Sequence, residues 1–218
     1  MTLNMLHLPA PGGNASTLLI MLAGAYDKPA DFIAAGFDHA LQASHRALDL
    51  IFVESDLAAV CDGTLADALE HQIVAPARKQ AYRRILTGGI SIGGLTALMH
   101  ADRHPASSDG LVLIAPYPGN RSITREIAAA GGLAAWPAAA HYPMNDERLG
   151  WRALQALAHR PHAPLWLGYG SEDRFAGGHA LMAAVLAPHQ VTTLAGGHDW
   201  PTWLRLWQHY LEFGRTNN

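Results

Sequence analysis

The sequence predicts an α/β protein with a predominantly parallel central sheet and helices on both faces. Short apolar runs rich in branched residues alternate with longer segments of helical periodicity. Within each run the apolar residues are consecutive, which is typical of strands buried on both faces. The chain has 218 residues, of which 50% are hydrophobic and 15% charged, so it falls in the size range of one large domain. We expect a single domain over 1–218.

Six apolar runs are expected to form the strands of this sheet. Each run is short, and glycine, proline, serine or acidic residues lie at or near its ends, as expected for buried strands that end in turns. The expected strands lie at 17–24, 47–55, 83–89, 111–117, 164–170 and 190–197.

Helical spacing of apolar residues fills the segments between these runs. The first helix is expected to begin with Asp27 as its N-cap, because Pro29 and a run of spaced apolar residues follow it. Pro76 is expected to kink or end one of the later helices. Alternating strands and helices imply parallel strands joined by helical crossovers. The later helices are expected at 64–81, 92–103, 177–187 and 202–213.

The segment 118–163 breaks this alternation, because prolines and glycines interrupt its short helical pieces. Two interpretations remain open. The segment is either an ordinary crossover helix with irregular ends or a small cap that covers the substrate. We expect its residues Trp136 and Trp151 to line the substrate pocket.

Composition argues against several classes of partner. The net charge is −3 and the basic residues are scattered, so the basic surface that binds nucleic acid is not expected. Cys61 is the single cysteine and has no partner for an internal disulfide. The N-terminus shows no signal-peptide pattern, which favours a cytoplasmic location. No apolar run is long enough to predict a membrane span.

The sequence Gly-Ile-Ser-Ile-Gly at 89–93 lies where an expected strand ends and an expected helix begins. A serine on such a turn adopts strained backbone angles, and the flanking glycines let the strand and the helix approach closely. Ser91 is therefore expected to be a nucleophile at the carboxyl end of the sheet. The alternative is a glycine-rich turn without chemistry. The glycine spacing matches neither a dinucleotide-binding loop nor a P-loop.

A serine nucleophile requires a base, and His198 is the best of the 13 histidines. It follows an expected strand and lies in a glycine turn, so a loop can place its ring over the sheet edge. Asp173, just after the strand at 164–170, is expected to orient this histidine. Glu172 is the fallback, because it is one residue away on the same turn. A capping role for either His198 or Asp173 is the simpler alternative.

The negatively charged oxygen that forms during acyl transfer needs backbone N–H donors. Ile92, at the start of the helix after Ser91, is expected to supply one donor. Ala25, which follows Gly24 in the loop after the first strand, is expected to supply the other. Tyr26 is then expected to contact the substrate from the same loop.

The order serine, aspartate, histidine resembles that of the α/β-hydrolase superfamily, and the resemblance extends from about residue 17 to 213. TGGISIGGLTALMHADRHP looks like that superfamily's nucleophile elbow and following helix, GYGSEDRF like its acid turn and GGHDW like its histidine loop. The length is similar to that of small carboxylesterases and acyl-thioesterases. The resemblance implies the α/β-hydrolase fold, at most a small cap, and no metal or organic cofactor. The chain departs from many members in carrying Ala23 where they carry histidine.

The expected function is hydrolysis of a small-molecule carboxylic ester through an acyl-enzyme on Ser91. A thioesterase or an acyltransferase with the same triad is one alternative, and a non-catalytic binding protein of the same fold is another. His100 and His104 have a spacing that can bind a metal, but they are expected to form a solvated helix face instead.

Overall fold

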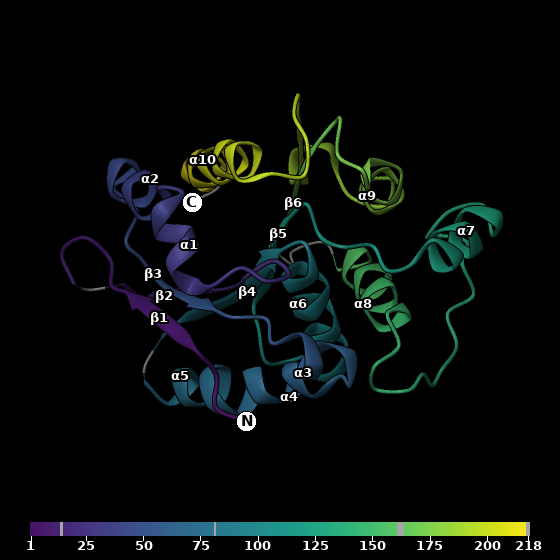
Figure 1. Ribbon diagram of the computed structural model, residues 1–218, viewed down its shortest axis with the longest axis horizontal. Helices are drawn as coiled ribbons and strands as arrows, with labels where there is room; N and C mark the ends of the chain where they lie inside the picture. The colour runs from purple at the N-terminus through teal and green to yellow at the C-terminus, as the bar shows by residue number, and fades with distance from the viewer. Residues whose placement is uncertain (14, 81, 161–163, 217–218) are drawn as a thin grey trace.

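The computed structural model describes residues 1–13, 15–80, 82–160 and 164–216, and its centre is one twisted sheet (Figure 1). The described strands form a seven-stranded sheet in the order β1-β3-β2-β4-β5-β6-β7. Only β1 is antiparallel to its neighbour, and the other pairs are parallel. The strands are β1 (Met5–Leu8), β2 (Thr17–Leu22), β3 (Leu48–Val53), β4 (Arg84–Ile90), β5 (Gly110–Ile114), β6 (Leu165–Gly170) and β7 (Val191–Leu194).

This architecture confirms the predicted fold class, and each of the six predicted strands is present, with bounds that differ by at most three residues from the expected ones. The sequence reasoning missed β1. That strand has four residues and alternates between exposed and half-buried side chains, so it lacks the continuous apolar run that marks the buried strands. It pairs with β3 at the edge of the sheet.

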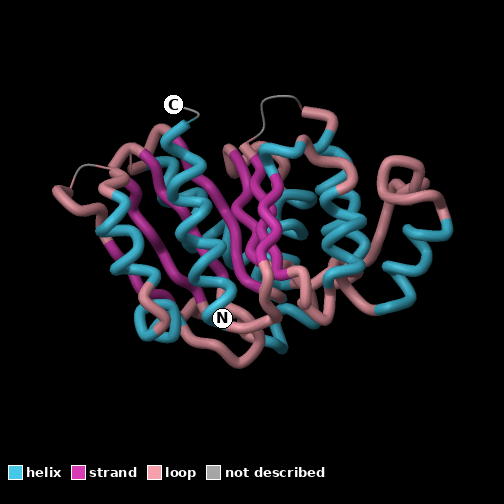
Figure 2. Tube along the Cα trace, turned by 90° about the horizontal axis from the view of Figure 1, so that it is seen from above, coloured by secondary structure: helices cyan, strands magenta, loops and turns pink. Residues whose placement is uncertain are grey.

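Helices cover both faces of the sheet (Figure 2). One face carries α1 (Pro29–Ala34), α2 (Phe37–Ser44) and α10 (Trp200–Thr216), and the apolar residues of the other helices pack mainly on the opposite face. Among the residues that are described, no helix combines the length and the apolar character needed to cross a membrane. The other helices are α3 (Leu57–Cys61), α4 (Thr64–Leu69), α5 (Ala75–Lys79), α6 (Ile92–Arg103), α7 (Arg121–Ala129), α8 (Arg148–Ala158) and α9 (Ala176–Ala183).

The first helical region differs from its prediction at its start. Lys28, not Asp27, is the N-cap of α1, and the side chain of Asp31 accepts a hydrogen bond from the Lys28 N–H at 2.7 Å. A break separates α1 from α2 because Gly36 adopts a left-handed conformation with φ of 90°. Asp27 is therefore left in the loop before the helix, where its carboxyl group faces Gly24.

The distortion predicted at Pro76 takes the form of a π-helical segment, Glu70–Val74, between α4 and α5. Proline has no N–H and its ring crowds the preceding turn. A wider turn just before Pro76 accommodates this ring while the chain stays helical.

The segment 118–163 contains two separate helices, and residues 161–163 lie outside the described part of the chain. Helix α8 packs along α6 and acts as the crossover between β5 and β6. Helix α7 lies beside α9, at the outer edge of the molecule in Figure 1. Helix α8 therefore corresponds to the expected crossover helix. The residues from 118 to 147 lie before it, and we refer to them as the insertion.

An aromatic cluster anchors α10 to the sheet and to α2. The ring of Trp207 stacks on Phe37 at 5.6 Å and on Tyr210 at 5.5 Å between ring centroids. Its indole N–H donates a hydrogen bond of 3.0 Å to the carbonyl of Phe37. Trp207 is completely buried, so it holds the helix that follows His198.

We predict that Trp207→Ala lowers the free energy of unfolding by about 3–5 kcal/mol, because it opens a cavity and leaves the Phe37 carbonyl without its donor. Urea denaturation followed by fluorescence measures this change. Gln208→Ala, at an exposed position on the same helix, is the matched control and should change the value by less than about 0.5 kcal/mol. Equal losses in the two variants would contradict the anchoring role.

Candidate active site

Ser91 occupies the sharp turn between β4 and α6. Its backbone has φ of 52° and ψ of −117°, a region that residues other than glycine rarely adopt. A Cβ atom at Gly93 would clash with the carbonyl oxygens of Leu22 and Ala23. Glycine at this position therefore lets the helix approach β2, as the sequence pattern predicted.

Backbone hydrogen bonds hold the turn in place. The Ser91 N–H donates to the carbonyl of Ile114 at 3.2 Å, and the Ser91 carbonyl accepts from the Tyr117 N–H at 2.7 Å. Both partners belong to β5 or to the loop that follows it. The neighbouring strand thus fixes the conformation in which the Ser91 hydroxyl stands at the carboxyl edge of the sheet, where the parallel strands end.

The side chains of Ser91, His198 and Asp173 form a continuous chain of hydrogen bonds. The Ser91 Oγ lies 2.9 Å from Nε2 of His198, and Nδ1 of the same ring lies 2.7 Å from Oδ2 of Asp173. These distances fit a hydroxyl that donates to the ring and a ring N–H that donates to the carboxylate. The structure brings the three sequence-predicted residues together from three different loops.

The side chain of Asp173 is fully buried and accepts two hydrogen bonds. Burial acts to raise its pKa, but the hydrogen bond from His198 and the one from the Phe175 N–H (2.8 Å) favour the charged form and outweigh it. The pKa of Asp173 therefore lies below its usual value, and the group is ionised at neutral pH. A negative charge at this point fixes the histidine tautomer that accepts the serine proton.

Glu172 and Asp199 are the acidic neighbours of Asp173 and His198 in the sequence, and they occupy different positions. Glu172 is exposed on the same turn. Asp199 caps α10, because its Oδ1 accepts a hydrogen bond of 2.9 Å from the Thr202 N–H. Asp173 is therefore the acid that contacts the histidine.

Aromatic rings hold His198 from two sides. Phe175 and Trp203 meet the imidazole edge to face, with ring centroids 5.1 and 5.0 Å away. Such contacts restrict the rotation of the ring. The side chain of His198 is only 8% exposed, so the ring is shielded from most of the solvent.

His179 is a second buried histidine near the site, and the sequence analysis did not identify it. Its Nε2 lies 2.8 Å from the carbonyl of Pro116, one residue before the Tyr117 N–H that binds Ser91. Burial lowers the pKa of His179, so the neutral ring donates to that carbonyl. It is a positioning residue for the loop after β5. No sequence pattern distinguishes it from other helical histidines.

Ile92 and Ala25 are the two expected oxyanion donors. Ile92 is the first residue of α6, so its N–H has no partner within the helix. Ala25 follows Gly24, and a Cβ atom on Gly24 would be 3.8 Å from the Cβ of Ser91. The loop after β2 therefore runs close to the nucleophile.

Asp27 lies in the same loop, and the sequence analysis assigned it only a capping role. Its Oδ2 would be 2.5 Å from a Cβ on Gly24, so its carboxyl group lies against Gly24, in the loop that carries the expected donor Ala25. Burial and the nearby Asp31 raise the pKa of Asp27, and a hydrogen bond with the side chain of Trp200 opposes this shift. Two signals in the sequence could have pointed to Asp27: its loop contains a glycine, and this loop follows the end of a strand.

The three expected substrate contacts differ in exposure. Tyr26, in the loop after β2, is 85% exposed and has a φ of 69°, and its contact with a substrate stays a prediction. Trp136 and Trp151 are 3% and 0% exposed, so both rings lie in the core, and their contact with a substrate stays a prediction. The indole N–H of Trp151 donates to the Pro118 carbonyl at 2.8 Å, and that of Trp136 donates to Glu126 at 2.9 Å. The first bond joins α8 to the start of the insertion, and the second lies within the insertion.

The histidine pair on α6 is engaged by acidic residues rather than lying on a solvated face. His100 is fully buried and its Nε2 lies 2.9 Å from Glu70, while His104 lies 2.9 Å from Asp67. The prediction of a solvated helix face is therefore wrong for His100. These pairs connect α6 to the helical region before Pro76.

Comparisons with known proteins find similarity at the level of structure. No protein-family model matches the chain, and no curated relative matches it. A fluorophosphonate-binding serine hydrolase of Staphylococcus aureus, FphF, superposes with a TM-score of 0.67 over 98% of both chains at 12% identity. Est1E from Butyrivibrio proteoclasticus superposes with a TM-score of 0.67 over 99% of this chain and 93% of its own, at 16% identity.

An S-formylglutathione hydrolase from Agrobacterium tumefaciens also superposes, with a TM-score of 0.59 over 97% of this chain and 88% of its own, at 14% identity. The chain has the α/β-hydrolase fold. In proteins of this fold the nucleophile, the acid and the histidine come in that order along the chain. Ser91, Asp173 and His198 follow β4, β6 and β7 in that order.

We predict that Asp173→Asn lowers the free energy of unfolding at pH 7. Because the folded-state pKa of Asp173 lies below the unfolded value, the ionised carboxylate contributes stability above its usual pKa, and this contribution disappears as pH falls through the folded-state value. The difference between wild type and Asp173→Asn should therefore shrink as pH falls below about 4. Chemical denaturation at a series of pH values measures it, with Glu172→Gln as the control. A difference that stays constant over this range would contradict the assignment.

Proposed function

We propose that this protein hydrolyses carboxylic esters through an acyl-enzyme on Ser91. The supporting observation is the continuous hydrogen-bonded chain from the Ser91 hydroxyl through His198 to the ionised Asp173. A serine hydroxyl is a weak nucleophile unless a base removes its proton. This arrangement supplies that base, its orientation and its charge compensation.

In the first step, Oγ of Ser91 attacks the ester carbonyl carbon while Nε2 of His198 takes the hydroxyl proton. The carbonyl oxygen becomes an oxyanion, which accepts hydrogen bonds from the N–H groups of Ile92 and Ala25 in this proposal. The tetrahedral intermediate then breaks its bond to the alcohol oxygen. His198 returns the proton to that oxygen, so an alcohol leaves and the acyl group stays on Ser91.

In the second step, water attacks the acyl-enzyme. His198 takes a proton from the water, and the resulting tetrahedral intermediate breaks its bond to Oγ of Ser91. The imidazolium returns the proton to Oγ, which restores the free serine and releases a carboxylic acid. Asp173 stays ionised in both steps and stabilises the imidazolium.

Thioester hydrolysis with the same residues is the second candidate. One of the similar structures is named as an S-formylglutathione hydrolase, and the chemistry of its named substrate group differs from an oxygen ester only in the leaving atom. Turnover of a matched oxygen ester and thioester with the same acyl group separates the two candidates.

We predict that Ser91→Ala abolishes turnover of p-nitrophenyl acetate above background, and that Asp173→Asn lowers kcat by about 10³-fold or more, because the histidine then loses its orienting charge. Release of p-nitrophenol at pH 7.5 measures both. Glu172→Gln removes an exposed carboxylate one residue from Asp173 and should retain kcat within about twofold.

Turnover that survives in Ser91→Ala would refute the proposal. An equal loss of kcat in Glu172→Gln and Asp173→Asn would also refute it, because the loss would then come from a change in the turn and not from the missing acid. Circular dichroism of each variant confirms that it is folded.

A further inference from the structure

A cavity of about 340 Å³ lies along α6, and its size is at the lower end of the range for small-molecule sites. Ile92, the residue after Ser91, forms part of its wall. Leu95 and Met99 continue that wall along the same side of α6, three and seven positions further on. The cavity therefore starts beside the nucleophile elbow and extends along the helix.

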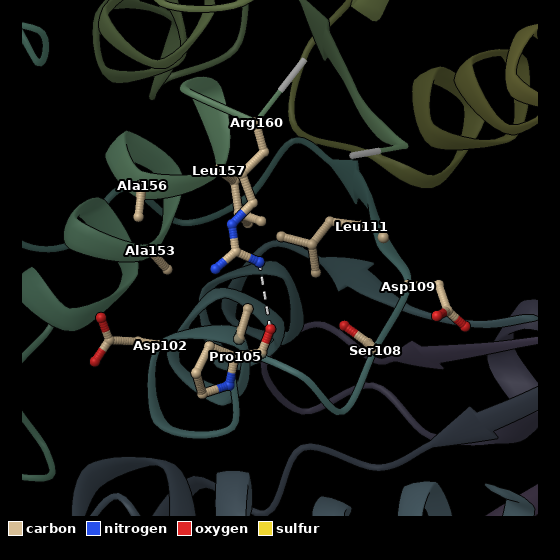
Figure 3. Close-up of a pocket in the computed structure, with 11 residues that line it drawn as sticks. Asp102, Pro105, Ser108, Asp109, Leu111, Ala153, Ala156, Leu157 and Arg160 are labelled. Carbon is tan, nitrogen blue, oxygen red and sulfur yellow. Dashed lines mark hydrogen bonds between the residues drawn. The ribbon is translucent and has the colours of Figure 1, made fainter. Parts of the chain in front are cut away.

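Loops at the carboxyl edge of the sheet supply most of the other walls. Val60 and Cys61 come from α3, which follows β3, and Ile123 comes from α7, which follows β5. Ligands of open α/β sheets bind at this edge. A second cavity, of about 110 Å³, lies at the opposite edge near the start of β5 and is bordered by Asp102, Pro105 and Arg160 (Figure 3). Its position separates it from the triad.

The 340 Å³ cavity has an apolar interior and a polar rim. Leu95, Met99 and Ile123 are buried, whereas the rim residues are exposed or half-buried. The rim consists of Asn120, Asn145, Asp146, Glu147 and Arg148. This distribution suits an apolar chain that enters past a wet rim.

The charges on the rim disfavour an anionic ligand. Arg148 is the only basic residue among the lining residues that are described, and its guanidinium is bound by Glu126 at 2.7 Å and by Asp146 at 3.3 Å. The rim also carries the carboxylate of Glu147. The net charge of the cavity rim is therefore negative or close to zero, which favours uncharged acyl chains over anionic ones.

The position of the cavity relative to His198 determines whether the cavity binds the acyl group or the alcohol group of an ester. The leaving oxygen must reach Nε2 of His198, because that ring returns the proton. Neither the loop of Asp173 nor that of His198 is among the described walls of the cavity, whereas Ile92, an expected oxyanion donor, is. The cavity therefore takes the acyl chain, which extends from the carbonyl carbon on the side away from the leaving group.

We propose that this cavity binds the acyl chain, and that the preferred substrates are esters of uncharged, medium-length apolar acids. The inference rests on the proposed function of Ser91. Burial of a methylene group improves binding about fourfold, so kcat/KM should rise by about that factor for each added carbon until the cavity is full and then level off. An acyl chain of the same length that ends in a carboxylate should be a poor substrate.

Cys61 provides a direct test, because it is exposed, lines the cavity and is the single cysteine of the chain. Benzyl methanethiosulfonate forms a disulfide with the Cys61 thiol and releases a sulfinate, which places a benzyl group in the cavity. We expect this adduct to lower kcat/KM for p-nitrophenyl hexanoate at least tenfold and to leave that for p-nitrophenyl acetate within twofold. Reduction by dithiothreitol should restore the hexanoate activity.

Cys61→Ser treated with the same reagent is the matched control and should be unaffected. Met99→Ala is a second variant, which deepens the apolar wall and should shift the preference toward longer chains. The wild type should also prefer p-nitrophenyl butyrate to the hemisuccinate. Intact mass confirms each adduct.

An adduct of confirmed mass that leaves the hexanoate-to-acetate ratio unchanged would overturn the acyl-pocket assignment, while acetate turnover would still support the function of Ser91. Absence of turnover for every ester in the wild type would instead refute the proposed function, and with it this inference. A preference for the hemisuccinate would also overturn the assignment.

Discussion

The strained backbone at Ser91 is the constraint on which the rest of the site depends. A residue other than glycine in this conformation costs about 1–3 kcal/mol, and the turn persists because its surroundings allow little else. Backbone hydrogen bonds to Ile114 and Tyr117 hold it on one side. Gly93 allows α6 to approach the ends of β2 on the other. The hydroxyl is thereby raised above the sheet edge, where a histidine from another loop can reach it.

This position of Ser91 divides the surroundings into two sides with different chemistry. On the side of β6 and β7 lie the ionised Asp173 and the imidazole of His198, packed among aromatic rings. On the side of α6 and the insertion lies an apolar cavity that begins at Ile92. Proton transfer and chain binding are therefore assigned to opposite sides of one carbonyl group. The insertion from 118 to 147 contributes to the second side through the cavity rim. The buried ring of Trp136 lies within this insertion, and Trp151 binds its first residue from α8.

Much of this arrangement could be predicted from the sequence, because the relevant signals are local. Consecutive apolar residues marked the buried strands, and glycines on both sides of Ser91 marked the turn. The errors concern features that depend on tertiary packing. The burial of His100 follows from its contact with Glu70 in the helical region before Pro76. The contacts of His179 with Pro116 and of Asp27 with Trp200 join segments that are distant in the sequence. Strand β1 escaped detection because four half-exposed residues at an edge carry almost no hydrophobic signal.

The most direct test of the account is the intact mass of the protein after incubation with a fluorophosphonate. The account predicts that the wild type gains the mass of one phosphonyl group, that digestion places this group on Ser91, and that Ser91→Ala gains none. A wild type that remains unmodified, or a label that persists in Ser91→Ala, would contradict the claim that the elbow, His198 and Asp173 together activate this serine.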